Sequence, residues 1–209
     1  MKLVIFGATG TVGRQVVQQA LAQGHTVTAF ARNLTKLNIQ HSQLSVAQGD
    51  VMDDAAVEQA IRGQDAVVCV LGAGKQLKST IRSAGTQQII QAMEKVGLRR
   101  LICLSTIGTG DSWSNLDFYW KYVMFGFILR QVLADHERQE ALVRNSNLDW
   151  TIVRPGALTD GPLTGDYRHS FPSSDRNITL QISRADVADF ILKQLSDQAS
   201  LYQAPSLSY

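Results

Sequence analysis

Lys2-Leu-Val-Ile-Phe-Gly-Ala-Thr-Gly-Thr-Val-Gly13 is the stretch of sequence that decides the fold. Its apolar run from Leu3 to Phe6 is typical of a strand buried on both faces of a parallel sheet. Glycines follow at positions 7, 10 and 13, and apolar residues at helical spacing come after them. A glycine-rich turn between strand and helix lets the backbone approach a pyrophosphate, whose charge the helix N-terminus stabilises. The stretch therefore predicts a dinucleotide site, although its G-x-x-G-x-x-G spacing differs from the G-x-G-x-x-G fingerprint.

The rest of the chain repeats the alternation of strand and helix. Apolar runs predict further strands at residues 25–30, 44–47, 65–71, 100–105, 148–153 and 178–182, and helices at residues 14–23, 54–61, 80–96, 135–144 and 187–195. Asp53 or Asp54 is a candidate N-cap, and Ser183-Arg-Ala-Asp186 reads as a capping box. Strict alternation predicts an α/β fold, a doubly wound parallel sheet of the Rossmann type. In such a sheet a dinucleotide binds at the carboxyl ends of the strands, near the switch point.

Length and composition fit one globular domain. The chain has 209 residues, of which 44% are hydrophobic, and a net charge of +2. No cluster of Lys and Arg is dense enough to predict a nucleic-acid partner. We interpret the early start of the first strand as leaving no room for a targeting peptide, and we find no transmembrane segment. We therefore expect a single domain over residues 1–209 that is cytoplasmic and monomeric.

The cysteines and histidines give no sign of a disulfide or a metal site. Cys69 and Cys103 both fall in apolar runs that read as strands, and we expect them to be reduced core thiols. His25, His41 and His169 lie far apart in sequence and have no acidic or cysteine partners at ligand spacing.

The end of the second strand predicts which nicotinamide cofactor binds. An NAD site usually carries Asp or Glu at this position, whereas an NADP site carries Arg. This chain has Arg32 and no acid between residues 26 and 48, and Lys36 adds a second positive charge. We therefore favour NADPH, with NADH weaker; a solvated surface position is the alternative for both side chains. Asp50, at the end of the third strand, is a candidate acceptor for the adenine amino group or else a simple turn residue.

The segment from Phe118 to Leu133 is the most apolar and aromatic part of the chain. Lys121 and Arg130 interrupt it, and it falls short of the ~20 apolar residues that a membrane span needs. Three interpretations stay open: a core helix, a flap over the substrate pocket, and a membrane-surface or dimer face. We expect residues 106–134 and 154–177 together to form the substrate pocket.

A Tyr-x-x-x-Lys pair, which many short-chain dehydrogenases use for acid–base catalysis, is absent. Val123 stands four residues after Tyr119, Gly126 after Tyr122, and Phe171 after Tyr167. Reduction of an ordinary ketone needs a positioned acid for the developing alkoxide, so an alcohol dehydrogenase is disfavoured.

Several motifs together resemble the atypical short-chain dehydrogenase/reductase superfamily, in its small NAD(P)H-binding, NmrA-like branch. They are Phe6-Gly-Ala-Thr-Gly-Thr-Val-Gly13, Ala31-Arg32, Gln48-Gly-Asp50-Val51, Gly63-Gln-Asp-Ala-Val67, Val70-Leu-Gly72, Val153-Arg-Pro155 and Ile182-Ser-Arg-Ala-Asp-Val187. Asp160-Gly-Pro-Leu-Thr-Gly-Asp-Tyr167 is more particular, and it makes the chain most similar to the flavin reductase/biliverdin-IXβ reductase family.

The resemblance implies roles for individual residues. The cofactor would contact Gly7, Thr9, Gly10, Thr11, Val12, Arg32, Lys36, Asp50, Val51, Leu71, Gly72, Ala73, Pro155 and Gly156. Ser105 and Thr106 would supply the catalytic-face hydroxyl. His136 aligns with a family histidine near the pocket, and a surface helix histidine is the alternative. Arg168 is a candidate to pair with a phosphate or propionate of the acceptor, and an exposed loop arginine is the alternative. Ala157 stands where the mammalian enzymes have a pocket histidine.

These observations lead to one favoured function and two alternatives. We expect an NADPH-dependent reductase that transfers a hydride directly to a flavin, bound as a substrate and not as a tightly bound prosthetic group, and also to biliverdin-IXβ. Such planar, conjugated acceptors take their proton from water, so the protein needs only to position them. The first alternative is a non-catalytic NmrA-like redox sensor that binds NADP(H) and acts through protein partners. The second is an isomerase or epimerase on a nucleotide sugar.

Overall fold

The computed structural model describes residues 1–74, 76–172, 175 and 177–209. Within these residues, eight strands form the main sheet in the order β3-β2-β1-β4-β5-β6-β10-β8. The strands are β1 (Lys2–Phe6), β2 (Thr26–Ala31), β3 (Leu44–Gln48), β4 (Ala66–Cys69), β5 (Arg100–Leu104), β6 (Asp149–Pro155), β8 (Arg168–His169) and β10 (Ser206–Ser208). Strands β1 to β6 pair in parallel, which confirms the doubly wound α/β fold. The strand order reverses between β1 and β4, and this is the switch point at which such sheets bind ligands.

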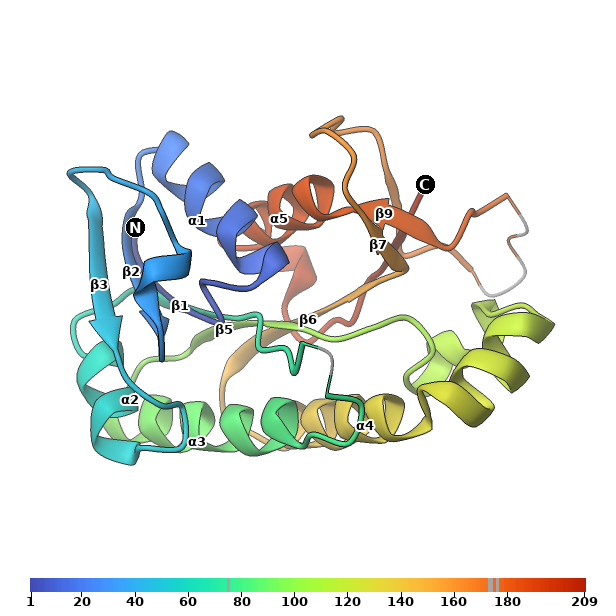
Figure 1. Ribbon diagram of the computed structural model, residues 1–209, viewed down its shortest axis with the longest axis horizontal. Coiled ribbons are helices and arrows are strands. Elements are labelled where there is room, and N and C mark those ends of the chain that lie inside the picture. The colour runs from blue at the N-terminus through green and yellow to red at the C-terminus, as the bar shows by residue number, and fades with distance from the viewer. Residues whose placement is uncertain (75, 173–174, 176) are drawn as a thin grey trace.

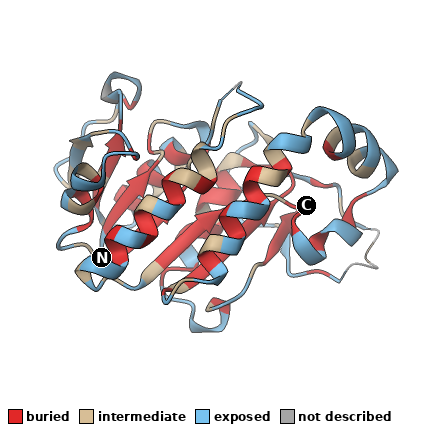
Figure 2. Cartoon of the chain, turned by 90° about the horizontal axis from the view of Figure 1, so that it is seen from below, coloured by how far each residue is buried: buried red, intermediate tan, exposed pale blue. Residues whose placement is uncertain are grey.

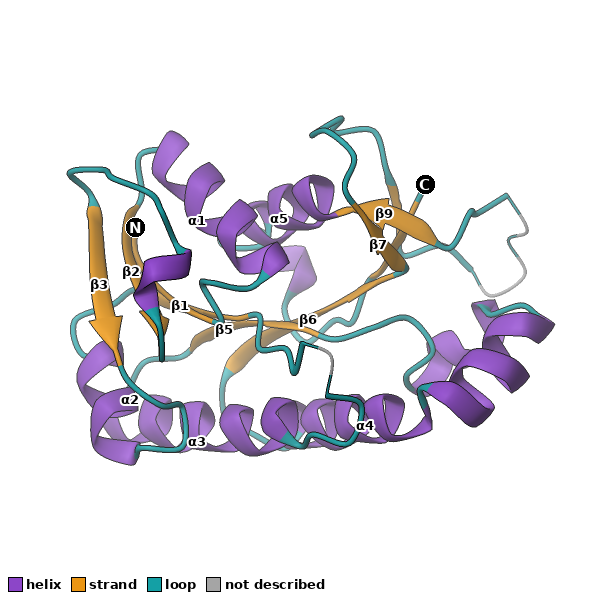
Figure 3. Ribbon diagram, viewed as in Figure 1, coloured by secondary structure: helices purple, strands orange, loops and turns teal. Residues whose placement is uncertain are grey.

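Helices cover both faces of the sheet (Figures 1 and 3). Helices α1 (Thr11–Ala22) and α5 (Arg184–Lys193) lie on one face, and α2 (Asp54–Ile61), α3 (Ile81–Val96) and α4 (Arg130–Arg144) lie on the other. Both predicted N-caps form: the Asp53 side chain accepts from the N–H groups of Ala55 and Ala56, and Ser183 Oγ accepts from the Asp186 N–H at 3.0 Å. The capping box is only half formed, because the Ser183 N–H donates to the Tyr209 hydroxyl at 3.1 Å. Short 3-10 turns, η1 (Leu34–Lys36), η2 (Gly110–Asn115) and η4 (Gln198–Ser200), lie in the connections.

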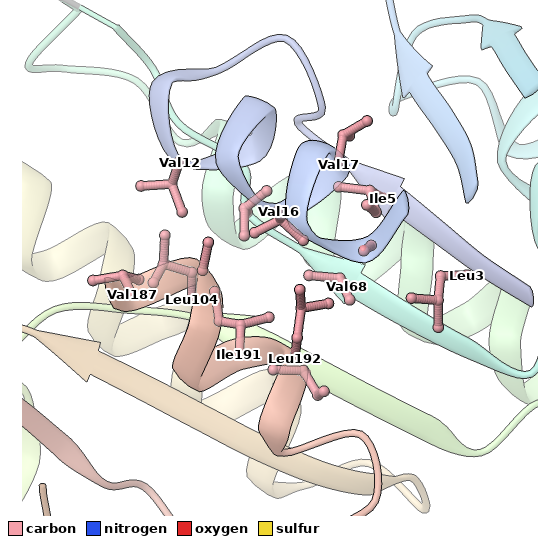
Figure 4. Close-up of a cluster of buried hydrophobic side chains, with 14 of the residues drawn as sticks. Leu3, Ile5, Val12, Val16, Val17, Val68, Leu104, Val187, Ile191 and Leu192 are labelled. Atoms are coloured by element: carbon pink, nitrogen blue, oxygen red, sulfur yellow. The ribbon is translucent and has the colours of Figure 1, made fainter. Parts of the chain in front are cut away.

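Alternation along the strands divides the core into two clusters. Leu3 and Ile5 of β1 pack on the side of α1 and α5, whereas Val4 and Phe6 pack on the side of α2 and α3. Figure 4 shows the first cluster, in which valines of α1 meet Val187, Ile191 and Leu192 of α5. Figure 2 shows the buried residues concentrated on the sheet, with exposed residues on the outer sides of the helices. The continuous apolar runs therefore reflect strands that are covered on both faces.

The C-terminal strands differ from the prediction. Residues 178–182 were expected to form a seventh strand; only Gln181–Ser183 is extended (β9), and it pairs with β7 (Ala157–Thr159) in a separate two-stranded sheet. The main sheet is extended instead by β10, which runs parallel to β6, and by β8, which is antiparallel to β10. Only Leu207 is apolar in β10, so sequence periodicity gives no signal for this strand.

The apolar segment 118–133 is not a core helix, so that interpretation is wrong. It forms a π-helix, η3 (Tyr119–Ile128), followed by the start of α4, at one end of the molecule (Figure 1). Phe118, Tyr122 and Phe127 are 74%, 62% and 84% exposed. Phe125 and Leu133 are buried, and they belong to a third cluster with Ile107, Leu116, Phe171 and Leu180. The rest of the protein therefore covers η3 on the side of Phe125, and other aromatic side chains of the segment are exposed. No helix within the described residues is long and apolar enough to cross a membrane.

The two cysteines are free and buried, as expected. Strand register places Cys69 of β4 directly beside Cys103 of β5. Cys69 Sγ also lies 3.4 Å from the hydroxyl of Thr86 on α3. Both thiols therefore belong to the sheet core beneath α3.

Candidate functional site

A cleft of about 570 Å³ lies at the carboxyl ends of the parallel strands. It is lined from the glycine turn, from the ends of β2 to β6, and from the first turn of α3 and one position on α4. The lining residues are Gly7, Thr9, Gly10, Thr11, Val12, Phe30, Ala31, Arg32, Lys36, Gly49, Asp50, Val51, Val70, Leu71, Gly72, Gly74, Ile81, Arg82, Leu104, Ser105, Thr106, His136, Pro155, Gly156 and Leu158. Nearly every residue to which the sequence assigns a site role therefore meets in one place.

The glycine turn is built so tightly that side chains cannot replace hydrogen at two of its positions. Gly7 has φ +87°, and a Cβ there would lie 2.5 Å from the carbonyl oxygen of Val70. A Cβ on Gly13 would lie 2.1 Å from the carbonyl oxygen of Gly7. The Gly10 N–H donates to that same oxygen at 2.9 Å, and no side chain caps the start of α1. The uncapped N–H groups of the first helical turn thus face the cleft, as anion binding requires.

Two cationic side chains mark the end of the cleft near β2. Arg32 follows directly after β2 and is exposed, and Lys36 lies in η1 one turn further on. Asp50 lies in the same end; its Oδ1 accepts from the Met52 N–H at 3.0 Å, so one oxygen holds the turn. The other oxygen of this exposed carboxylate accepts no hydrogen bond from the described residues and is available to a ligand.

At the opposite end of the cleft, Ser105 and Thr106 differ in what their hydroxyls do. Ser105 is buried and its Oγ donates to Glu140 Oε1 at 2.7 Å. Thr106 is half-buried, and its Oγ1 makes one long bond, to the Ile107 carbonyl at 3.2 Å. The Ser105 hydroxyl is therefore committed to the protein interior. Thr106 is the hydroxyl better placed to contact a ligand.

Glu140 on α4 organises a buried ion pair beneath this end. Its two oxygens accept from Arg154 Nε at 2.9 Å and Nη2 at 2.6 Å, and Thr109 Oγ1 donates to Oε1 at 2.5 Å. Burial disfavours the charged carboxylate, but the bonds to Arg154, with those to Thr109 and Ser105, hold the pKa of Glu140 below its ordinary value. No sequence motif predicts a site role for Glu140, and Arg154 belongs to the Val153-Arg-Pro155 motif without a role of its own.

His136 lies in the cleft wall on the face covered by α3 and α4. Burial, with the nearby charge of Arg82, lowers the pKa of His136 to about 4, so the ring is neutral at physiological pH. Gln139 donates its Nε2–H to Thr86 Oγ1 at 3.0 Å, which turns its Oε1 toward His136 Nδ1 at 3.2 Å. This arrangement assigns the ring proton to Nδ1 and leaves Nε2 as a hydrogen-bond acceptor.

Two predicted site residues lie outside the cleft lining. Ala73 is not among the lining residues, although Gly72 and Gly74 on either side of it are. Arg168 lies on β8, where it pairs with Asp175 and donates to the Asn177 carbonyl at 3.0 Å. The expectation that Arg168 meets the substrate in this cleft is therefore not met, because its β-strand is at the far edge of the main sheet.

The predicted substrate pocket also contributes less of the cleft than expected. Of residues 106–134 and 154–177, only Thr106, Pro155, Gly156 and Leu158 line it. The segment 118–133 lines none of it, so the flap interpretation finds no support. A larger hollow of about 1220 Å³ is lined in part by β8, β10 and α5, and none of the predicted cofactor residues lines it.

The Asp160–Tyr167 motif acts through a buried acid on α5. Asp186 Oδ1 accepts from the N–H groups of Thr164 and Gly165, both at 2.9 Å, and Tyr209 donates its hydroxyl to Oδ2 at 2.5 Å. These bonds outweigh burial and lower the pKa of Asp186. These hydrogen bonds hold the loop that contains the motif to the start of α5.

The comparisons with known proteins agree with this fold and cleft. A profile of the NAD(P)H-binding family matches residues 7–198, and the chain belongs to this family. The atypical short-chain dehydrogenase/reductase character inferred from the motifs is thereby confirmed, and the protein is a member of an oxidoreductase family.

Individual relatives cover almost the whole chain. The chain is 32% identical over 207 residues to protein YMR090W of Saccharomyces cerevisiae, covering 93% of this chain and 87% of the yeast protein. The solved oxidoreductase ylbE from Lactococcus lactis superposes with a TM-score of 0.85 at 26% identity, over 99% of this chain and 90% of ylbE. The anaerobilin reductase ChuY from Escherichia coli O157:H7 gives a TM-score of 0.82 at 28% identity, over 99% and 96% of the two chains.

Proposed function

We propose that the protein is an NADPH-dependent reductase that transfers a hydride directly to a planar, conjugated acceptor: a flavin, or a linear tetrapyrrole such as biliverdin-IXβ. The observation that carries this proposal is the chemistry of the cleft at the end near Thr106. That end offers a hydroxyl, a neutral histidine, a guanidinium and main-chain groups, and no tyrosine is among the described residues that line it.

The residues present fit a dinucleotide. The tight glycine turn and the uncapped start of α1 suit a pyrophosphate, while Arg32 and Lys36 suit a 2′-phosphate. A bound NADPH would supply the hydride. Across the switch point, Thr106, Pro155 and Gly156 would form the surface on which nicotinamide and acceptor meet.

The acid–base properties of the same end favour an acceptor that needs no protein acid. His136 is neutral with its proton on Nδ1, so Nε2 accepts hydrogen bonds and does not supply a proton. Flavins and bilins delocalise the transferred electrons and take their proton from solvent. A ketone places the charge on one alkoxide oxygen and needs a positioned acid. The similarity to ChuY, which is described as an anaerobilin reductase, supports a tetrapyrrole among the acceptors.

The deciding experiment is steady-state oxidation of NADPH and NADH with FMN and then biliverdin-IXβ as acceptor. We expect turnover with both acceptors and a higher kcat/KM with NADPH. Tight NADPH binding without turnover on either acceptor would reject the reductase and favour a sensor.

The sensor is retained as a second candidate because of one observation. The exposed aromatic face of η3, formed by Phe118, Tyr119, Tyr122 and Phe127, is a surface that a protein partner would cover. A sensor would bind NADPH at the same cleft but would not oxidise it, whichever acceptor is supplied.

A further inference from the structure

Arg82 is a nearly buried cation whose guanidinium donors make few hydrogen bonds to the described residues. It lies in the first turn of α3, and its side chain is 12% exposed. Its Nη1 is buried and has no hydrogen-bond partner among the described residues, and Asp135 Oδ2, the carboxylate oxygen with which it pairs, is 3.6 Å away. No side-chain hydrogen bond from this guanidinium to another described residue is present. A buried guanidinium with five N–H donors normally finds acceptors for most of them.

Asp135 balances the charge of Arg82, but its oxygens accept hydrogen bonds from other groups. Its Oδ1 accepts from Ser83 Oγ at 2.5 Å and from the Ser83 N–H at 3.2 Å, and its Oδ2 accepts from the Arg82 N–H at 3.3 Å. The carboxylate therefore fixes the start of α3. The ion pair holds the Arg82 side chain in place and leaves its donors for another acceptor.

The position of Arg82 indicates where that acceptor comes from. Arg82 lines the cleft beside His136, on the side of the sheet covered by α3 and α4. Arg32 and Lys36 occupy the other end, and the glycine turn belongs to α1 on the opposite face. Asp50, at that other end, is the one acidic residue among the described residues that line the cleft. Arg82 is thus the charged side chain that lines the end near Thr106, and it is distinct from the cations that suit the cofactor phosphates.

We propose that Arg82 binds an acidic group, a carboxylate or a phosphate, carried by the acceptor that this site reduces. The proposal rests on the reductase function proposed above and narrows its substrate class to anionic acceptors. A planar guanidinium pairs with either group through two parallel hydrogen bonds, and a low-polarity wall strengthens both of them. Thr106 and His136 would then contact the ring system, while Arg82 would fix its acidic substituent.

Two matched pairs of acceptors test the proposal. FMN and riboflavin share one ring system and differ in the phosphate, and biliverdin and its dimethyl ester differ in the two free carboxylates. We expect the wild-type protein to favour at least one acidic member by about tenfold in kcat/KM, as a charge-assisted bidentate contact implies. Arg82→Gln should abolish this preference. It should change the kcat/KM with the uncharged acceptor and the Kd of NADPH less than about twofold. Arg82→Lys should keep part of the preference.

Controls separate a local effect from a loss of structure. Arg138→Gln removes the same charge from the exposed face of α4 and should leave the preference unchanged. Arg82→Gln with Asp135→Asn removes both charges of the pair while keeping an amide oxygen that can accept from Ser83, and it should behave like Arg82→Gln alone. Equal losses with the acidic and uncharged acceptors, or a loss confined to NADPH binding, would overturn the proposal.

A binding measurement distinguishes failure of this inference from failure of the proposed function. Flavin fluorescence would report binding of FMN and riboflavin to the NADP⁺-saturated protein. If NADPH oxidation is absent with all four compounds, the reductase function is rejected. Tighter binding of FMN than riboflavin that depends on Arg82 would still support the anion site, and identical binding of each acidic and uncharged pair would reject it.

Discussion

We propose that Arg32 determines the cofactor preference, because it stands where an NAD site usually has an acidic residue that accepts from the ribose 2′-hydroxyl. It is exposed at the end of β2, and Lys36 lies in the same end of the cleft. A guanidinium pairs with a 2′-phosphate and gains little from a hydroxyl. We therefore expect the cofactor preference to depend on Arg32 and Lys36, because the rest of the site suits either dinucleotide.

Arg32→Glu is expected to weaken NADPH binding about 100-fold while changing NADH binding less than about threefold, because it replaces a charge-assisted contact by repulsion. Titration of both cofactors by nicotinamide fluorescence measures this. Lys36→Gln should give a smaller effect in the same direction. A similar loss for the two cofactors would show that Arg32 does not read the 2′-phosphate.

Ser105 and Thr106 should separate stability from turnover. Ser105→Ala removes a hydrogen bond to buried Glu140 and should lower the free energy of unfolding by about 1–2 kcal/mol. Thr106→Val should leave stability within about 0.5 kcal/mol and lower kcat at least about tenfold. Urea unfolding and NADPH oxidation with FMN give the two readouts. The assignment fails if Thr106→Val is the destabilised protein and Ser105→Ala the slow one.

At the scale of the element, helix α4 matters because its inner face is polar. Asp135, His136, Gln139 and Glu140 are all buried, and each has a hydrogen-bond partner on α3, on β6, in the loop that follows β5, or within α4 itself. The helix thus forms the underside of the reacting end of the cleft. Buried polar networks of this kind fix one geometry when every member is satisfied.

His136 makes the stability of the protein depend on pH. The pKa of the ring is about 4 when folded and 6.5 ordinarily. Between these values the unfolded chain binds a proton that the folded protein excludes, so stability falls as the pH falls from 6.5 through 4, by up to about 3 kcal/mol. Urea unfolding at several pH values should show this component in the wild type and lose it in His136→Gln. His169→Gln, an exposed position, is the control and should retain it; parallel curves for all three proteins would contradict the buried neutral ring.

The π-helix η3 offers a matched pair of phenylalanines. Phe125 is buried against Ile107 and Leu116, whereas Phe127 is 84% exposed. Phe125→Ala should cost about 3–5 kcal/mol through lost burial and a cavity, and Phe127→Ser should stay within about 0.5 kcal/mol. Chemical denaturation measures both. Comparable losses would mean that the exposed face of η3 is covered in the protein as it exists in solution.

At the scale of the whole molecule, the sequence predicted what strongly patterned segments do. Buried runs such as Leu3–Phe6 and Ala66–Cys69 specify parallel strands, and the glycine turn specifies the edge at which the cleft forms. β10 escaped prediction because its place depends on main-chain pairing with β6 and on one apolar side chain. Burial of Arg82 was invisible for a similar reason, since Asp135, which holds it, lies 53 residues further along the chain.

The exposed face of η3 shows a different failure of prediction: the sequence pattern suggested burial that the structure does not have. High apolar content predicts burial only where another element is available to cover it, and η3 lies at one end of the molecule beyond the sheet. Composition could therefore identify the segment as unusual. It could not say that only Phe125 and Leu133 would turn inward.

The two ends of the cleft come from different parts of the chain. Arg32, Lys36 and Asp50 lie within the first quarter of the sequence, whereas Thr106, His136 and Gly156 all follow residue 104. Under the proposed function, we expect mutations at the acceptor end to leave the other end intact, so that related proteins can differ in the acceptor that they reduce while keeping the same electron donor. Recombination near Gly72, between the two halves, would exchange one specificity without the other.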